Sequence, residues 1–176
     1  MADFSDPEYL AGWTNPILRV GDRPIYYFCV PGEPIPKART TQRAKWVDRK
    51  VRRSLDYQEK VAQCARLVWR VPPFPKDARI EIKCFFYRKD YHGVDRDNLV
   101  KSIQDGIERA GIVSRDERII RGSDILYTRV DRPHAKIFLC EVSGDSSLLG
   151  LLGESPDQAV RASRAFERKA RKTGRD

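Results

Sequence analysis

The sequence predicts an α+β protein in which two principal helices pack on a single mixed β-sheet, with a helical tail at the C-terminus. Two segments, 55–70 and 97–110, carry apolar residues at the three- and four-residue steps of an amphipathic helix. Short runs rich in β-branched and aromatic residues stand before, between and after them, at 25–30, 78–89, 117–131 and 135–142. This order, without an internal repeat, favours one sheet layer with helices packed on it.

The N-terminal part is expected to contain one strand, a long loop and one helix. Residues 1–24 contain scattered glycine, proline and aspartate and are expected to be irregular, whereas IYYFCV at 25–30 predicts the first strand. Residues 31–53 begin with prolines and continue as a strongly basic run without a sustained period, which predicts a long exposed loop. The helix over 55–70 is expected to end before VPPFP.

In the C-terminal part, the segment ARIEIKCFFYRK alternates as a strand, with one apolar face made of Ile80, Ile82, Cys84 and Phe86. The helix over 97–110 is expected to end before Gly111, because glycine is favoured directly after a helix. Residues 135–142 predict the final strand. The expected organisation is an arm over 1–24, one folded unit over 25–142, and a linker with a basic helical tail over 143–176.

The charge balance favours a phosphate-rich partner. The 176 residues include 34 Lys and Arg against 25 Asp and Glu, which gives a formal net charge of +9 and a sequence pI of about 9.6. Such a balance favours nucleic acid over a role in solubility alone. No segment approaches the roughly 20 apolar residues of a membrane span, and the acidic N-terminus lacks the features of a signal peptide. We therefore expect a cytoplasmic protein that does not bind a membrane.

Each of the four cysteines lies inside an apolar stretch, and none belongs to a C-x-x-C pair. We expect reduced, buried thiols rather than a disulfide framework or a zinc site, at Cys29, Cys64, Cys84 and Cys140. The two histidines, His92 and His134, are too few for a histidine-rich metal site.

Three aspartates and a lysine form the most informative pattern in the chain, at Asp95, Asp97, Lys101 and Asp116. Oxygen donors without histidine or cysteine suit a hard cation such as Mg²⁺ or Mn²⁺, and such an ion supports phosphodiester cleavage by activating water and neutralising charge. The lysine would add positive charge beside the scissile phosphate. The alternative is also open that Asp97 is a helix N-cap and that it forms an ordinary surface ion pair with Lys101.

The segment VDRDNLVKSIQDGIERAGIVSRDERI resembles the signature of the RusA family of Holliday junction resolvases. The shared pattern is D-x-D-N-L-x-K, a D-[AG]-[LI] segment in the helix, a glycine, and an aspartate followed closely by an apolar position. It falls at Asp95, Asp97, Asn98, Leu99, Lys101, Asp105, Gly106, Ile107, Gly111, Asp116 and Ile119. The upstream VPGEPIPKARTT resembles the loop after the first strand of many members, so the resemblance covers about 25–142.

The resemblance implies a small homodimeric, Mg²⁺-dependent endonuclease that resolves four-way DNA junctions by paired symmetric nicks in recombination and repair. By position, Asp95, Asp97 and Asp116 would be the metal-binding catalytic carboxylates. Lys101 would be the catalytic lysine. Many members carry a second acid where this chain has Arg115, so Glu117 is a further candidate for the third ligand role. Family members are often encoded by phages and prophages, which fits a bacterial cytoplasm.

Seven basic residues in or near the predicted loops are candidates for contacts with DNA phosphates: Lys37, Arg39, Arg43, Lys45, Arg88, Lys89 and Arg96. For each of them, the alternative is a solvated surface charge.

Two other interpretations of the sequence are open. Glu81 and Lys83 share a strand face, with Asp77 upstream, which mimics part of a PD-(D/E)xK nuclease site, although amphipathic strands produce such pairs by chance. A non-catalytic DNA- or RNA-binding module would instead stack bases on aromatic rings beside the basic loop, with candidates at Tyr26, Tyr27, Trp46, Phe85 and Tyr87. That module would leave the carboxylates unexplained.

Overall fold

The computed structural model describes six stretches of the chain, namely 17–20, 23–38, 48–68, 74–90, 94–114 and 119–142. Within these stretches the elements in chain order are β1 (Ile17–Val20), β2 (Arg23–Pro31), α3 (Arg49–Val68), β3 (Ile80–Tyr87), α4 (Arg96–Arg109), β4 (Ile119–Tyr127) and β5 (His134–Glu141).

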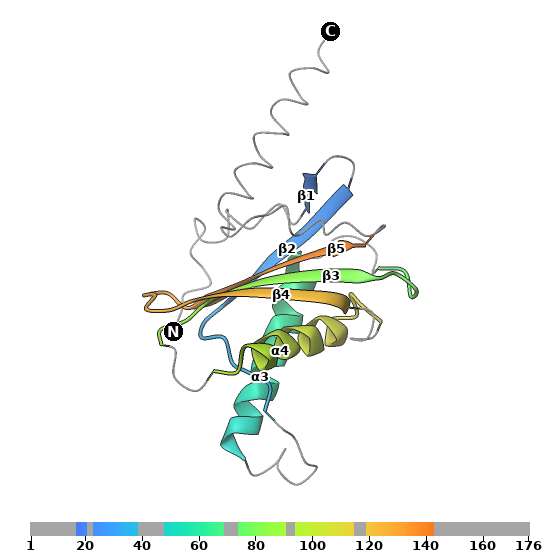
Figure 1. Cartoon of the computed structure of the whole chain (residues 1–176). Coiled ribbons are helices and arrows are strands. Elements are labelled where there is room, and N and C mark those ends of the chain that lie inside the picture. The colour runs from blue at the N-terminus through green and yellow to red at the C-terminus, as the bar shows by residue number, and fades with distance from the viewer. Residues whose placement is uncertain are drawn as a thin grey trace.

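The five strands form one mixed sheet in the order β1-β2-β5-β3-β4 (Figure 1). β3 and β4 run parallel, and the other neighbouring strands run antiparallel. Parallel neighbours need a crossover connection, and α4 supplies it between β3 and β4. Both helices pack on the same face of the sheet. The predicted α+β class with a mixed sheet and two principal helices is confirmed, whereas the predicted tail over 143–176 lies outside the described residues.

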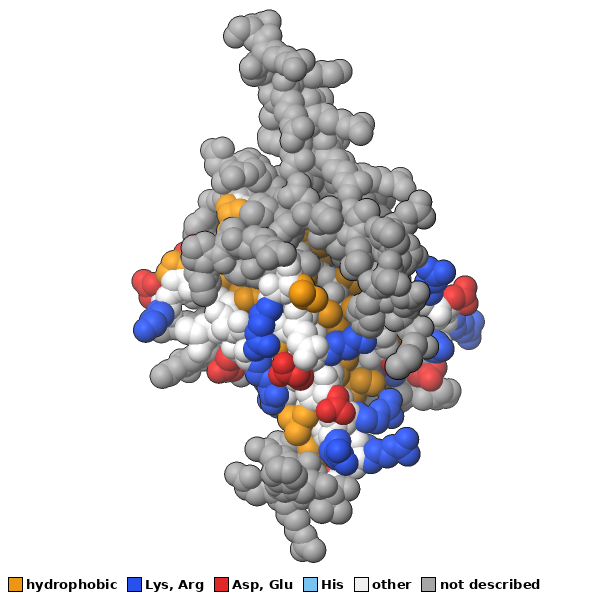
Figure 2. Space-filling model, turned by 180° about the vertical axis from the view of Figure 1, so that it is seen from behind, with side chains coloured by type: hydrophobic (Ala, Val, Ile, Leu, Met, Phe, Trp, Pro, Cys, Tyr) orange, Lys and Arg blue, Asp and Glu red, His pale blue; other side chains and the backbone are white. Residues whose placement is uncertain are grey.

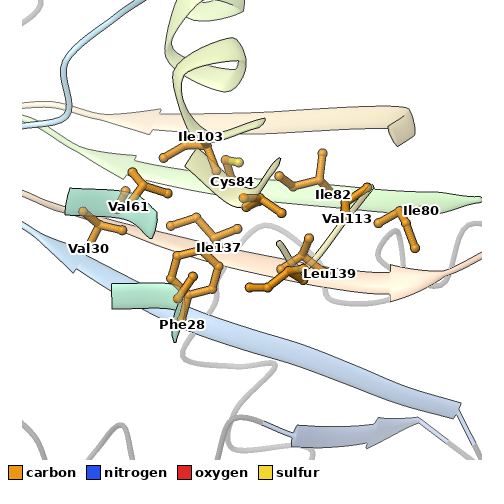
Figure 3. Close-up of a cluster of buried hydrophobic side chains, with 14 of the residues drawn as sticks. Phe28, Val30, Val61, Ile80, Ile82, Cys84, Ile103, Val113, Ile137 and Leu139 are labelled. Carbon is orange, nitrogen blue, oxygen red and sulfur yellow. The ribbon is translucent and has the colours of Figure 1, made fainter. Parts of the chain in front are cut away.

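The main core lies between the sheet and the two helices (Figure 3). β3 turns its predicted apolar face into this core, with fully buried side chains at Ile80, Ile82, Cys84 and Phe86. Val61 of α3 and Ile103 of α4 meet this face together with Ile137 of β5. Burying one such side chain contributes about 1.5–3 kcal/mol, so this layer fixes both helices to the sheet.

The opposite face of the sheet carries a second buried cluster, made of Ile25, Tyr27, Phe85, Phe138 and Cys140. The rings of Phe85 and Phe138 meet edge to face at 5.6 Å, and the rings of Tyr27 and Phe138 stack at the same distance. Such ring pairs add about 0.5–1.5 kcal/mol to the burial itself. Strands β2, β3 and β5 therefore bury apolar side chains on both faces of the sheet.

Helix α4 begins one residue earlier than expected, and Asp95 rather than Asp97 is its N-cap. Asp95 has an extended backbone, with φ −80° and ψ 112°. Its carboxylate accepts hydrogen bonds from the backbone N–H of Asp97 at 3.1 Å and of Asn98 at 3.4 Å. An N-cap of this kind satisfies backbone donors that the helix leaves unpaired. The capping role considered for Asp97 therefore belongs to its neighbour.

The C-terminal end of α4 confirms the prediction for Gly111, which has φ 75°. The N–H of Gly111 donates to the carbonyl of Glu108 at 2.9 Å, and the N–H of Ile112 donates to the carbonyl of Ile107 at 3.3 Å. These two bonds make a Schellman motif, in which the residue after the cap takes a left-handed conformation. Ile107 and Ile112 are both buried in the main core, which holds the turn against the sheet.

Two predicted boundaries in the N-terminal part are wrong. Helix α3 begins at Arg49, so the last residues of the predicted loop are helical. Leu67, which was predicted to widen the apolar stripe of this helix, does not belong to it, since Leu67 is 70 % exposed. The arm over 1–24 is not wholly irregular, because Ile17–Val20 forms β1 and pairs antiparallel with β2.

The two helices cross closely at Gly106 of α4. A Cβ atom built at Gly106 would lie 2.5 Å from Cγ1 of Val61 and 2.9 Å from the carbonyl oxygen of Gln58, both in α3. Gly106 is fully inside the contact, and Val61 is completely buried. The glycine is therefore required by the close approach of the two backbones rather than by its own dihedral angles.

None of the four cysteines forms a disulfide, as predicted. Cys84 and Cys140 are buried, whereas Cys29 and Cys64 are only half-buried. Burial raises the pKa of the Cys84 thiol, and the carboxylate of Asp124 raises it further. Burial likewise raises the pKa of the Cys64 thiol. Neither described helix combines the length and the apolar composition that crossing a membrane requires.

Candidate active site

The first turn of α4 presents the two predicted carboxylates at the protein surface. Asp95 and Asp97 are both exposed, one as the N-cap and the other inside the first turn. The carboxylate of Asp95 also accepts a hydrogen bond from the side-chain amide of Asn98 at 2.7 Å. That bond and the two capping bonds hold Asp95 in one orientation, so the cap that starts the helix also fixes a candidate ligand.

Lys101 lies one helical turn after Asp97 and is exposed. The expected surface ion pair between these two side chains is not formed within the described residues. There, neither the Asp97 carboxylate nor the Lys101 ammonium has any hydrogen bond or ion pair. Both groups therefore face solvent and are available to a ligand, which the alternative of a simple surface pair does not explain.

The third predicted carboxylate, Asp116, lies outside the described residues, and so do Arg115 and Glu117. Among the described residues, no three His, Cys, Asp or Glu side chains lie close enough to form a metal site. The donors that are placed, Asp95 and Asp97, are exposed oxygen ligands of the type that hard divalent cations prefer. The chemistry of these two donors fits such an ion, with at least one further ligand needed.

Arg96 stands between the two carboxylates in sequence but is directed toward β4. Its Nε donates to the Asp124 carboxylate at 2.7 Å, and its Nη2 donates to the Asp124 backbone carbonyl at 2.8 Å. The side chain predicted to contact a phosphate therefore also ties the first turn of α4 to the neighbouring strand. Two charge-assisted bonds to one residue fix direction as well as distance.

Arg88, another predicted phosphate contact, is 7 % exposed and is surrounded by protein partners. Its Nη1 donates to the carbonyl of Pro34 at 2.6 Å, and its Nε lies 3.1 Å from the carboxylate of Glu33. Asp90 provides a third partner on the other side. The structure thus uses Arg88 to hold the segment 33–38 against the end of β3.

Asp105 connects that same segment to both helices. Its carboxylate accepts from Nζ of Lys37 at 3.0 Å and from the side-chain amide of Gln58 at 2.9 Å. The backbone N–H of Lys37 also donates to the carbonyl of Asn98 in the first turn of α4 at 2.8 Å. The aspartate of the D-[AG]-[LI] segment is therefore a link between elements, and Lys37 is partly occupied by it.

An open groove of about 780 Å³ lies beside this segment. We call it the cationic groove, and its lining is Glu33, Ile35, Pro36, Lys37, Ala38, Lys50, Arg53, Arg88, Lys89, Asp90, Val94 and Pro133. Five of these residues are cationic and two are acidic. Figure 2 shows Lys and Arg side chains gathered toward the lower half of that view, where α3 begins.

Of the predicted phosphate contacts, Lys37, Arg88 and Lys89 line the groove. Arg39, Arg43 and Lys45 lie outside the described residues. The predicted phosphate contacts did not include Lys50 and Arg53, because both were placed in a loop where each was one charge among many. The signal that would have found them is a helix start at Asp48, whose carboxylate accepts from the N–H of Lys50 at 2.8 Å.

The pair Glu81 and Lys83 lies on the other face of the sheet, away from the helices. Their exposed fractions are 2 % and 8 %, so they do not form a solvated polar face. The thiol of Cys140 lies 3.9 Å from the Glu81 carboxylate, and the Lys83 ammonium lies 5.5 Å from the centre of the Phe85 ring. These residues are not brought to the carboxylates of α4.

The aromatic residues proposed for base stacking are largely engaged with one another. Tyr27 and Phe85 are buried in the second cluster, and Tyr26 meets Phe74 edge to face. The ring of Tyr87 stacks on Tyr127 at 4.7 Å, and also on the ring of His134. Trp46 lies outside the described residues. The structure therefore gives these rings a packing role.

Exposed carboxylates at a helix start, a lysine one turn later and an adjoining cationic groove suit the processing of a nucleic acid by a basic α+β protein. Comparison with family models matches residues 31–139 to endodeoxyribonuclease RusA. The match covers more than half of the chain, and the chain belongs to the RusA family of endodeoxyribonucleases. Enzymes of this family act on Holliday junctions and generally depend on a divalent metal.

Comparison with curated proteins finds no match. Among solved structures, the chain is similar to a HypE–HypF complex, with 13 % identity, a TM-score of 0.30, and coverage of 80 % of this chain and 40 % of that chain. It is also similar to the hydrogenase maturation protein HypE, with 17 % identity, a TM-score of 0.25, and coverage of 78 % and 40 %. The chain thus spans less than half of these structures, and the likeness indicates no shared function.

Proposed function

We propose that this chain is a Mg²⁺-dependent endonuclease that resolves four-way DNA junctions by paired symmetric nicks, with Mn²⁺ as a substitute ion. The observation that carries the proposal is the first turn of α4. There Asp95 is fixed by three hydrogen bonds, while Asp97 and Lys101 face solvent without a partner among the described residues. The membership of residues 31–139 in the RusA family supports the same chemistry.

In this proposal Asp95, Asp97 and Asp116 hold the metal ion, and Glu117 is the alternative third ligand. A divalent ion at such a site lowers the pKa of bound water and neutralises charge on the phosphate. Asn98 keeps the Asp95 carboxylate oriented through its amide. Lys101 places a positive charge where the phosphate gains negative charge during cleavage. The Arg96–Asp124 link holds this turn in place against β4.

The remaining parts of the proposal follow from the substrate. A four-way junction is two-fold symmetric, so cutting two of its strands in a paired way requires two active sites related by the same symmetry, which a homodimer provides. Recombination and repair generate such junctions, and the expected location is the cytoplasm of a bacterium or of a phage-infected cell.

The decisive experiment compares Asp95→Asn with Asp95→Ala. Asparagine caps a helix about as well as aspartate, whereas alanine costs about 1 kcal/mol of stability. Both variants remove the charged ligand, so both are expected to lose cleavage of a labelled four-way junction in Mg²⁺, and only Asp95→Ala is expected to melt lower. Junction binding, followed by gel shift, should persist in Asp95→Asn.

Two controls separate this proposal from its alternatives. Glu81→Ala removes the acid of the strand-face pair and is expected to leave the cleavage pattern unchanged. Chelation of divalent ions by EDTA should stop cleavage by the wild type without abolishing binding. Full cleavage by Asp95→Asn, or cleavage lost only in Glu81→Ala, would show that the site lies elsewhere.

A further inference from the structure

We propose that the cationic groove is a track for the sugar–phosphate backbone of a DNA arm, and that Lys50 and Arg53 of α3 are its main phosphate-contacting groups. This inference rests on the proposed function. It adds the part of the protein that contacts the DNA at positions distant from the scissile phosphate. It assigns a binding role to the start of α3, a segment outside the motif that carries the family resemblance.

The cations of the groove fall into two sets. Arg88 and Lys37 are occupied by protein carboxylates and carbonyls. Lys50, Arg53 and Lys89 are exposed, and within the described part of the chain their side chains form no hydrogen bond or ion pair. Three cations thus face the groove with their charge uncompensated.

The two acidic residues of the groove do not cancel this charge. Glu33 lies 3.1 Å from Nε of Arg88, and Asp90 lies 3.5 Å from Nη2 of the same side chain. Both carboxylates therefore share one buried arginine, which leaves one negative charge against the three free cations. The free charge that remains is positive, which fits a polyanion and opposes a cationic partner.

The position of the groove relative to the candidate active site favours DNA as the occupant. Val94 lines the groove, and the next residue in the chain is Asp95. The backbone N–H of Lys37 in the groove is bonded to Asn98, in the first turn of α4. A strand whose phosphate is cut at Asp95 can therefore continue into the groove. Contacts to phosphates give affinity and register without reading sequence, which suits an enzyme that recognises a branched shape.

The local sequence of α3 supports a binding role over a folding role. The first turn of this helix contains no acidic residue, and cations predominate over 49–53. Positive side chains at this end of a helix oppose the helix dipole. Asp48 caps this helix, but cations that oppose its dipole and lie free along a groove are expected where the cations serve a ligand.

The test uses the full-length protein with Lys50→Ala/Arg53→Ala. Alanine is a strong helix former, so the start of α3 is expected to persist, and a thermal melt checks this. The matched control is Lys76→Ala/Arg79→Ala, which removes the same charge at two exposed positions near the opposite end of β3. Binding of a labelled four-way junction is measured over about 50–200 mM salt, a range in which phosphate contacts respond strongly.

Each phosphate contact contributes about 0.9 to the slope of log affinity against log salt. Loss of two contacts should therefore lower the slope by about 1.8. The ratio of wild-type affinity to variant affinity should then fall about ten-fold from the lowest to the highest salt concentration. The control variant should keep the wild-type slope.

A wild-type slope in Lys50→Ala/Arg53→Ala would overturn the inference, and so would an equal loss of slope in the control variant. A groove that instead binds an acidic peptide would give that same unchanged slope. These results are distinguishable from failure of the proposed function, in which the wild type itself would not cleave the junction.

Discussion

Replacing Gly106 with alanine would place a methyl group inside the contact between α3 and α4. The new Cβ would lie 2.5 Å from Cγ1 of Val61, 2.6 Å from its Cβ, and 2.9 Å from the carbonyl oxygen of Gln58. Carbon atoms in favourable contact stay about 3.5–4.0 Å apart. The Cβ of Val61 and the backbone oxygen cannot rotate away, so the two helices have to separate or shift.

The expected magnitude follows from two opposed terms. Overpacking a filled contact costs about 1–3 kcal/mol. Alanine is better than glycine in a helix interior by about 1 kcal/mol, which offsets part of that cost. Because two of the three close atoms are fixed by the helix itself, we expect a net destabilisation of about 1–2 kcal/mol, or a fall of several degrees in Tm for a chain of this size.

A double-mutant cycle measures this effect. Denaturant unfolding gives the free energy of unfolding of four proteins: the wild type, Gly106→Ala, Val61→Ala and the double variant. Val61→Ala removes the nearest atom but keeps the Cβ, so it should relieve part of the strain. We expect a coupling energy of about 0.5–1.5 kcal/mol between the two sites. An increase in stability on Gly106→Ala, or strict additivity in the double variant, would refute the close-approach argument.

The remaining predictions concern the links around this crossing. Asp105→Ala removes the carboxylate that accepts hydrogen bonds from Lys37 and Gln58, so it should lower the free energy of unfolding by about 1–3 kcal/mol. Glu108 is exposed on the same helix, and Glu108→Ala should change the free energy of unfolding little. Tyr57 is buried, its hydroxyl has no hydrogen-bond partner among the described residues, and burial raises its pKa well above the ordinary value near 10. The neutral form is therefore the folded form, so stability should be complete below about pH 10 and should fall as the pH rises beyond it. Tyr57→Phe should be no less stable at neutral pH and should show a smaller alkaline decline, and an unchanged decline would assign it to other groups. Asp124→Asn weakens the link to Arg96 and should slow single-turnover cleavage without weakening junction binding, and a parallel loss of both would instead indicate general unfolding.

The elements that were predicted correctly are those whose burial follows a simple period. The strand face of β3 and the stripe of α4 could be read from the spacing of their apolar residues. The full buried face of α3 could not, because two of its buried positions are polar. Ser54 is buried because its hydroxyl accepts from the N–H of Ala38, and Gln58 is buried because it donates to Asp105. Their partners are distant in sequence, so no local pattern reveals them.

The same distinction applies to the candidate site. Asp95, Asp97 and Lys101 are neighbours on one helix, so their spacing predicted that they would lie together. The N-cap was assigned to the wrong aspartate, because both aspartates are suitable residue types and only the backbone conformation of Asp95 decides between them. The role of Arg88 was not predictable either, since its burial depends on a carbonyl at Pro34, 54 residues earlier in the chain.

Under the proposed function, placing the carboxylates and most of the free cations on different helices accounts for an acidic cluster in a basic protein. A cationic surface alone would bind DNA without directing its cleavage, and exposed carboxylates alone would repel the phosphate. In this fold the start of α4 carries the carboxylates, and α3 carries two of the three free cations of the groove, Lys50 and Arg53. The distance between the two sets then depends on how the helices cross, and the crossing is set by Gly106 against Val61. A larger residue there would move the groove relative to the carboxylates even if neither set changed. The glycine of the D-[AG]-[LI] segment is therefore expected to matter for the alignment of DNA as much as for stability.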